Sequence, residues 1–136
     1  FDKTGTLTGG RPQVGDLARA PDVTETTLLR VAASVERHSE HPLAKAVLDR
    51  AAAAGLVDGP LAARFTNVDG MGAKAEVDGN PVLLGNRRLM EEAGVDWRTM
   101  ESDVDRMQGG GRTVTDVALG GRLIGLLAVA DAVRAT

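Results

Sequence analysis

The sequence begins with a run of residues that could accept a phosphoryl group. Residues 2–8 read DKTGTLT, an aspartate followed by a lysine and by small or hydroxyl-bearing residues. A carboxylate can attack a phosphoryl group and store it as an acyl phosphate. The alternative is an ordinary aspartate at the end of a strand, and the length of the run argues against it. Asp2 is therefore the candidate nucleophile.

The residue two positions after Asp2 separates two kinds of aspartate chemistry. Aspartate phosphatases place a second aspartate there as a general acid, whereas this chain has Thr4. A threonine cannot protonate a leaving group or activate water to a comparable degree. We therefore expect a phosphoenzyme formed at Asp2 to persist.

A second candidate site lies in residues 36–47, ERHSEHPLAKAV. Glu36 ends one expected helix and His41 precedes the next, so both side chains could line the mouth between the helices. A carboxylate can accept a hydrogen bond from an adenine amino group, and a neutral imidazole can stack on the ring or bond to it. The alternative is that His41 caps the second helix and Glu36 is a solvated surface residue. His38 and Glu40 carry no comparable argument, and we assign them to solvent.

A third candidate lies in residues 68–86, VDGMGAKAEVDGNPVLLGN. Gly70 and Gly72 fall between two expected strands, where missing β-carbons let a ligand approach the backbone. This is not the dinucleotide-binding fingerprint, because a strand rather than a helix follows the glycines. A simple turn is the alternative for the glycines. For Asn86, which precedes an expected helix, the alternative is an N-cap.

The spacing of apolar residues follows a helical period in some segments of the chain and a strand period in others. Apolar spacing and the placement of Pro and Gly predict helices over residues 25–37, 42–54, 87–93 and 98–107. A strand is predicted over 13–19, hairpins between 65 and 86, and a last hairpin turning at Gly120 and Gly121. Antiparallel hairpins with separate helical pairs predict an α+β sandwich.

The composition excludes several classes of protein. A length of 136 residues is one domain's worth of chain. The absence of cysteine excludes disulfides and thiol chemistry, and two histidines are too few for an ordinary histidine metal site. A net charge of −3 with scattered basic residues argues against nucleic-acid binding. There is no apolar run of roughly 20 residues and no signal peptide, which favours a soluble protein of a reducing compartment.

Taken together, these motifs resemble the large cytoplasmic loop of a heavy-metal-transporting (type IB) P-type ATPase, of the copper-transporter kind. DKTGTLT is shared by P-type ATPases in general, and the His-Pro pair in SEHPLAKAV is similar to the marker of the heavy-metal subgroup. The resemblance covers nearly the whole chain. It implies a nucleotide-binding domain over about residues 16–127, built as a six-stranded antiparallel sheet flanked by two helical pairs. Residues 1–15 and 128–136 would be stubs of the phosphorylation domain.

The resemblance also implies roles for individual residues. The residues that match the family's motifs are Asp2 as the phosphorylated aspartate, Glu36 and His41 on the adenine side, Gly70 and Gly72 against the nucleotide, and Asn86 near the ribose and phosphates. Ala73 departs from the pattern, because Ile or Val often follows the second glycine, and the packing against the nucleotide is expected to loosen there.

The function implied for the whole protein is ATP hydrolysis coupled to metal export, with copper as the expected metal. The cofactors would be ATP and the Mg²⁺ that accompanies it, with most Mg²⁺ ligands outside this chain. The partners would be the remaining phosphorylation, actuator and transmembrane domains of a membrane protein, whose cytoplasmic side this monomeric piece would occupy. We expect the piece alone to bind nucleotide without turnover. Two alternatives stay open: a cap-bearing soluble aspartate phosphatase of the haloacid dehalogenase superfamily, and a nucleotide-sensing module that does not hydrolyse.

Overall fold

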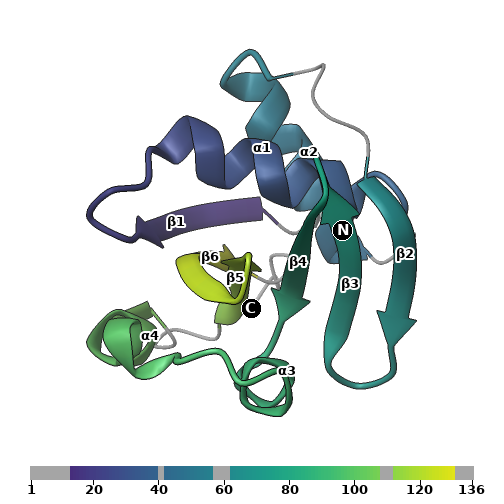
Figure 1. Cartoon of the computed structure of the whole chain (residues 1–136). Helices are drawn as coiled ribbons and strands as arrows, with labels where there is room; N and C mark the ends of the chain where they lie inside the picture. The colour runs from purple at the N-terminus through teal and green to yellow at the C-terminus, as the bar shows by residue number, and fades with distance from the viewer. Residues whose placement is uncertain (1–12, 40–41, 57–61, 108–111, 131–136) are drawn as a thin grey trace.

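The structure is a computed structural model that describes residues 13–39, 42–56, 62–107 and 112–130. Helices and strands alternate irregularly along it (Figure 1). The elements in chain order are β1 (Gln13–Arg19), α1 (Glu25–Glu36), α2 (Pro42–Ala53), β2 (Ala62–Val68), β3 (Gly72–Val77), β4 (Asn80–Gly85), α3 (Arg87–Glu92), the 3-10 turn η2 (Arg98–Met100), α4 (Glu101–Met107), β5 (Arg112–Leu119) and β6 (Arg122–Ala130).

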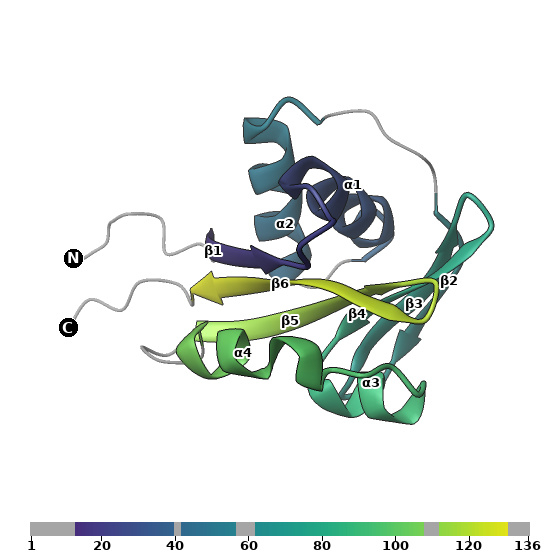
Figure 2. The same ribbon diagram turned by 60° about the vertical axis from the view of Figure 1, so that its left-hand side comes forward.

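The strands form one six-stranded sheet in the order β1-β6-β5-β4-β3-β2, and every neighbouring pair is antiparallel. Figure 2 shows α1 and α2 on one side of this sheet and α3 and α4 on the other. The predicted α+β architecture with two helical pairs is therefore confirmed. β1 begins at Gln13 and β6 ends at Ala130, so the expected domain boundaries after residues 15 and 127 fall within these two strands.

Residues 25–53 form the α1/α2 layer, which is anchored by apolar side chains. The Thr24 hydroxyl accepts a hydrogen bond from the Thr27 amide at 3.1 Å and so caps α1, as serine and threonine often do. Leu28 and Leu29 are completely buried against the sheet. The helix ends at Glu36, one residue before the predicted end. The Thr24 cap fixes where α1 begins, and its apolar face fixes how it packs. Together they place Glu36, the last residue of α1, at one end of the sheet.

Residues 87–107 form the α3/α4 layer, which is built from shorter pieces. α3 has six residues, and the predicted helix over 98–107 is split into η2 and α4. Its core contains three buried methionines packed against the second face of β5 and β6: Met90, Met100 and Met107. Met side chains fill irregular gaps, which suits a layer of short elements.

Several chain segments come together at the end of the sheet where β4 ends. Gly72 of β3 pairs with Gly85 of β4, and Gly85 pairs in turn with Asp116 of β5. The β2–β3 turn, the end of β4 and the beginning of β5 therefore lie at the same end of the sheet. The C-terminal end of α1 approaches this end from one side, and α3 begins there on the other (Figure 2).

Candidate functional site

A cavity of about 640 Å³ opens at this end of the sheet. Its described walls come from the end of α1, the β2–β3 turn, the end of β4 and the beginning of β5. The residues predicted from the sequence that line it are Glu36, Gly70, Gly72 and Asn86. Residues that are far apart in the sequence thus converge on one concave surface, which is the usual setting of a small-molecule site.

Three predicted residues lie outside the described part of the chain: Asp2, Thr4 and His41. Their expected roles stay predictions. Glu40 lies outside it as well, whereas His38 is exposed and its ring centroid lies 5.6 Å from that of Phe65.

Glu36 is half-buried at the C-terminal end of α1, and not the solvated surface residue that was the alternative. Burial disfavours the charged carboxylate and raises its pKa to about 7. Near neutral pH the carboxyl is therefore divided between its two protonation states. In the neutral form it donates one hydrogen bond and accepts another, and in the ionised form it only accepts.

Gly70 and Gly72 are both in backbone conformations that favour glycine, with φ of 74° and 145°. They differ in the space around them. A β-carbon on Gly72 would lie 2.0 Å from the Leu84 carbonyl oxygen and 2.6 Å from the Gly85 Cα, whereas one on Gly70 would meet no atom within 4 Å. The neighbouring strand therefore demands a glycine at position 72 whether or not a ligand binds. Gly70 is the position at which close approach of a ligand can be tested separately.

Asn86 caps α3, which was the structural alternative for this residue. Its side-chain oxygen accepts from the Leu89 amide at 3.1 Å, and its side-chain nitrogen donates to the Gly70 carbonyl at 3.0 Å. The backbone N–H of Asn86 also donates to the Met71 carbonyl at 2.9 Å. Asn86 thus ties the beginning of α3 to the glycine turn and holds two walls of the cavity together.

Further lining residues were not singled out from the sequence. Polar ones are Ser39, Asn67, Asp69, Thr113 and Thr115. The two threonines alternate along β5 on the same face as the buried Val117, and this period of two was the available signal.

The charged residues that line the described part of the cavity are all acidic. The described residues that line it include the carboxyl groups of Glu36 and Asp69 but no lysine or arginine.

Within the described ranges, no group of three or more His, Cys, Asp or Glu side chains is placed to hold a metal ion. The described part of the chain also contains no helix long and apolar enough to cross a membrane.

Comparison with known proteins places these features in a family. The model of the haloacid dehalogenase-like hydrolases matches residues 1–136. The chain is 40% identical over 135 residues to a copper-transporting P-type ATPase of Rhizobium leguminosarum bv. viciae, covering 99% of this chain and 16% of the relative. It is 38% identical to a silver exporting P-type ATPase of Salmonella typhimurium, again covering 99% of this chain and 16% of the relative. The chain thus spans about a sixth of the length of these curated relatives.

Solved structures give the same picture. A zinc-transporting PIB-type ATPase superimposes with a TM-score of 0.82 at 32% identity, over 98% of this chain and 21% of that one. The N-domain of a copper-transporting P-type ATPase superimposes with a TM-score of 0.72 at 28% identity, over 85% of this chain and 98% of that one. The chain therefore belongs to the haloacid dehalogenase-like hydrolase family, and its sequence and fold are similar to those of one part of heavy-metal P-type ATPases.

Proposed function

We propose that this chain binds ATP in the cavity at the end of the sheet, as the nucleotide-binding part of a heavy-metal-exporting P-type ATPase. The observation that carries the proposal is the convergence of Glu36, Gly70, Gly72 and Asn86 on one cavity. The names of the relatives support the same reading, since they include copper- and silver-exporting P-type ATPases. A soluble phosphatase is the less favoured alternative, because the relatives named above are transport ATPases.

In the proposed complex the adenine lies beside Glu36. In its ionised state the Glu36 carboxyl group can accept a hydrogen bond from the adenine amino group. Met71, Val68 and Ala73 supply apolar surface in the same cavity for the faces of the base. His41 would approach the ring from the beginning of α2, and the ribose would lie toward Asn86.

Asp2 is the proposed acceptor of the γ-phosphoryl group. One oxygen of its carboxylate bonds to the γ-phosphorus while the bond from that phosphorus to the β,γ-bridging oxygen breaks, and ADP leaves. Thr4 offers no second carboxylate, so the acyl phosphate persists until water hydrolyses it at a later step of the transport cycle. Mg²⁺ would enter with ATP, since no group of three or more His, Cys, Asp or Glu side chains among the described residues is placed to hold a metal ion. On its own, the chain should bind nucleotide without turnover.

The remaining proposals concern the whole protein. We propose that it is a membrane protein with this part on the cytoplasmic side, joined to phosphorylation, actuator and transmembrane domains. Copper is the proposed cargo. Formation and breakdown of the aspartyl phosphate would alternate the access of the transmembrane metal site.

Isothermal titration calorimetry of the chain with ATP tests the proposed site. We expect Glu36→Ala to lower ATP affinity at least tenfold, because a hydrogen bond to a charged group contributes about 1.5–3 kcal/mol. His41→Gln should lower it by about 1–2 kcal/mol, the scale of one good polar or stacking contact. The matched controls are Glu92→Ala and His38→Gln, at exposed positions that do not line the described cavity.

The base supplies a second arm of this experiment. GTP presents a carbonyl where ATP presents the amino group, so ionised Glu36 would face an acceptor. We expect tighter binding of ATP than of GTP, and a smaller difference in the Glu36→Ala variant. Unchanged ATP affinity in both Glu36→Ala and His41→Gln would overturn the adenine site.

A further inference from the structure

The described walls of the ATP cavity do not account for the charge of the ligand. A triphosphate carries several negative charges, and the ionisable groups among the described lining residues are the acidic side chains of Glu36 and Asp69. Like charges in a partly desolvated site repel strongly. The polyphosphate is therefore expected to leave this cavity toward basic side chains.

Basic side chains adjoin the cavity on the side of α3. A second hollow of about 380 Å³ shares Asn86 and Val114 with the first cavity, and its charged lining residues are Arg87, Arg88, Asp105 and Asp116. Asn86 thus lies at the border between a cavity whose charged residues are all acidic and a hollow that contains two guanidinium groups beside two carboxyl groups. A nucleotide with its base in the first cavity could place its phosphates in the second.

The two arginines are not equivalent. Arg87 is half-buried, and its guanidinium carbon lies 3.8 Å above the ring of Trp97 in a cation–π contact. Arg88 is exposed and, among the described residues, has no hydrogen bond, ion pair or ring contact. Arg87 is held by its neighbours, whereas Arg88 is available to a ligand.

The hollow also contains a buried carboxyl group that has no hydrogen bond or ion pair within the described residues. Asp116 of β5 is only 4% exposed, and none of the hydrogen bonds or ion pairs within the described residues involves its side chain. Buried polar side chains normally have a partner. Burial raises the pKa of Asp116 to about 6, and the charge of Arg87 opposes part of that shift. At neutral pH the group is mostly ionised and adds a negative charge to the hollow.

We propose that Arg88 binds the polyphosphate of the nucleotide, and that Asp116, facing the same hollow, weakens this binding. The inference rests on the proposed ATP function and assigns the phosphate subsite of that site. Arg88 offers planar paired N–H donors, which suit phosphate oxygens. Asp116 opposes the same phosphates by charge, without touching the base.

The test compares ATP with adenosine, which has the same base and ribose but no phosphate. Both ligands are titrated into the chain at low ionic strength and observed by NMR chemical shifts. We expect Arg88→Gln to lower ATP affinity roughly three- to tenfold, the range for an exposed charged contact, and to leave adenosine affinity unchanged. Arg98→Gln is the matched control, an exposed arginine of the same layer that lines neither described hollow.

Asp116→Asn is the second variant, and it should act in the opposite direction. We expect it to raise ATP affinity roughly two- to fivefold at pH 7.5 and to leave adenosine affinity unchanged. Raising the salt concentration should reduce both effects, because the phosphates are reached from the solvent. Circular dichroism of each variant checks the fold.

The outcomes separate this inference from the function on which it rests. ATP binding that is insensitive to Arg88→Gln would overturn the phosphate subsite and leave the adenine site standing. Equal losses of ATP and adenosine affinity would also overturn it, because the residue would then act on the whole site. A decrease in ATP affinity in Asp116→Asn would overturn the opposing role of this carboxyl group. If the unchanged chain binds neither ligand, the proposed function fails and the inference fails with it.

Discussion

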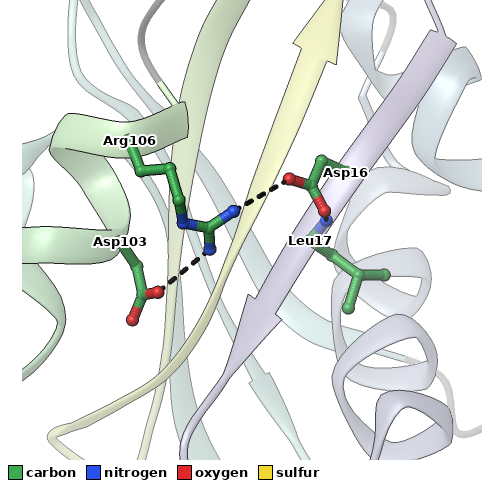
Figure 3. A network of polar contacts seen from close by, with 4 residues as sticks. All are labelled: Asp16, Leu17, Asp103 and Arg106. Atoms are coloured by element: carbon green, nitrogen blue, oxygen red, sulfur yellow. Dashed lines mark hydrogen bonds and ion pairs between the residues drawn. The ribbon is translucent and has the colours of Figure 1, made fainter.

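The two layers on either side of the sheet are attached to it in different ways. The α1/α2 layer presents long helices whose buried residues, such as Leu28 and Leu29, pack directly on the strands. The α3/α4 layer has shorter elements and is supplemented by polar contacts at its surface. Figure 3 shows one of them, in which Arg106 of α4 pairs with Asp103 at 3.0 Å and with Asp16 of β1 at 3.4 Å.

This difference indicates that the two halves of the candidate site have different local stability. Glu36 belongs to the layer held by extensive apolar burial, whereas Asn86, Arg87 and Arg88 belong to the layer of short helices. Segments with fewer buried apolar contacts open more readily. The wall proposed to bind the base should therefore be the more rigid one, and the wall proposed to bind the phosphates the more adaptable one.

Leu28→Ala should have the largest effect on stability. Leu28 is completely buried, and its side chain packs against the β6 backbone so closely that a β-carbon on Gly125 would lie 2.6 Å from a Leu28 methyl carbon. We expect the free energy of unfolding to fall by about 3–5 kcal/mol, since both the buried surface and the filled volume are lost. Urea denaturation followed by circular dichroism measures it.

The matched variant in the other layer is Met100→Ala. Met100 is 4% exposed, and we expect a loss of about 2–3 kcal/mol because the short elements around it can relax into the space. Amide hydrogen exchange gives an independent measure, with slower exchange expected in α1 than in α3 and α4. Equal losses and equal exchange in the two layers would contradict the difference in local stability.

Asp116→Asn should stabilise the chain at neutral pH. The carboxyl group ionises near pH 3.8 in the unfolded chain but near pH 6 in the folded one, because burial disfavours its charge. Between these values the folded state binds more protons, so stability falls as the pH rises. We expect a gain of about 1–3 kcal/mol in the free energy of unfolding above pH 7, absent below pH 4. Thermal midpoints at several pH values measure it, and a gain that is constant with pH would contradict the cause.

Glu36→Gln should also raise the free energy of unfolding, but over a different pH range. The pKa of Glu36 rises from 4.5 to about 7 on folding, so its unfavourable contribution grows as the pH rises between these values. We expect a gain of about 1–2 kcal/mol in unfolding free energy above pH 7, because the group is partly open to solvent. Between pH 6 and 7 this group should dominate over Asp116, and the absence of a slope there in the unchanged chain would speak against it.

Arg106→Gln should have the smallest effect. Its ion pairs with Asp16 and Asp103 are exposed, and pairs of this kind contribute about 0–1 kcal/mol. We expect a decrease in the free energy of unfolding within that range, and its disappearance at high salt. Chemical denaturation at low and high ionic strength measures the difference. A large, salt-independent loss would show that α4 depends on Arg106 for packing.

Much of the fold could be predicted from local patterns. The strand over Gln13–Arg19 has its predicted bounds, α2 begins at Pro42 as predicted, and the last hairpin turns at Gly120 and Gly121. The helix over 98–107 was less accurate, because η2 interrupts it before α4 begins. Element ends depend on packing as well as on sequence, so they are the least predictable part.

The candidate site was predictable in part. Glu36, Gly70, Gly72 and Asn86 were found from motifs, and they share one cavity. Asp116 was missed, although alternation along β5 places it on the same face as the half-buried Val114 and the buried Ala118. A carboxyl group at an inward-facing position of a strand was the signal that could have revealed it.

By itself, the sequence determined the features that depend on neighbouring residues: the Thr24 cap, the glycine turns, the apolar faces and the order of helices and strands. These follow from short-range hydrogen bonds and from backbone preferences. Only the tertiary structure decided that Gly72 must lack a β-carbon, that Asp116 is buried and Glu36 half-buried, and that Arg88 lines a hollow next to the candidate site. These properties arise between strands and layers that meet across long stretches of chain, and burial and charge depend on every group brought to the same place.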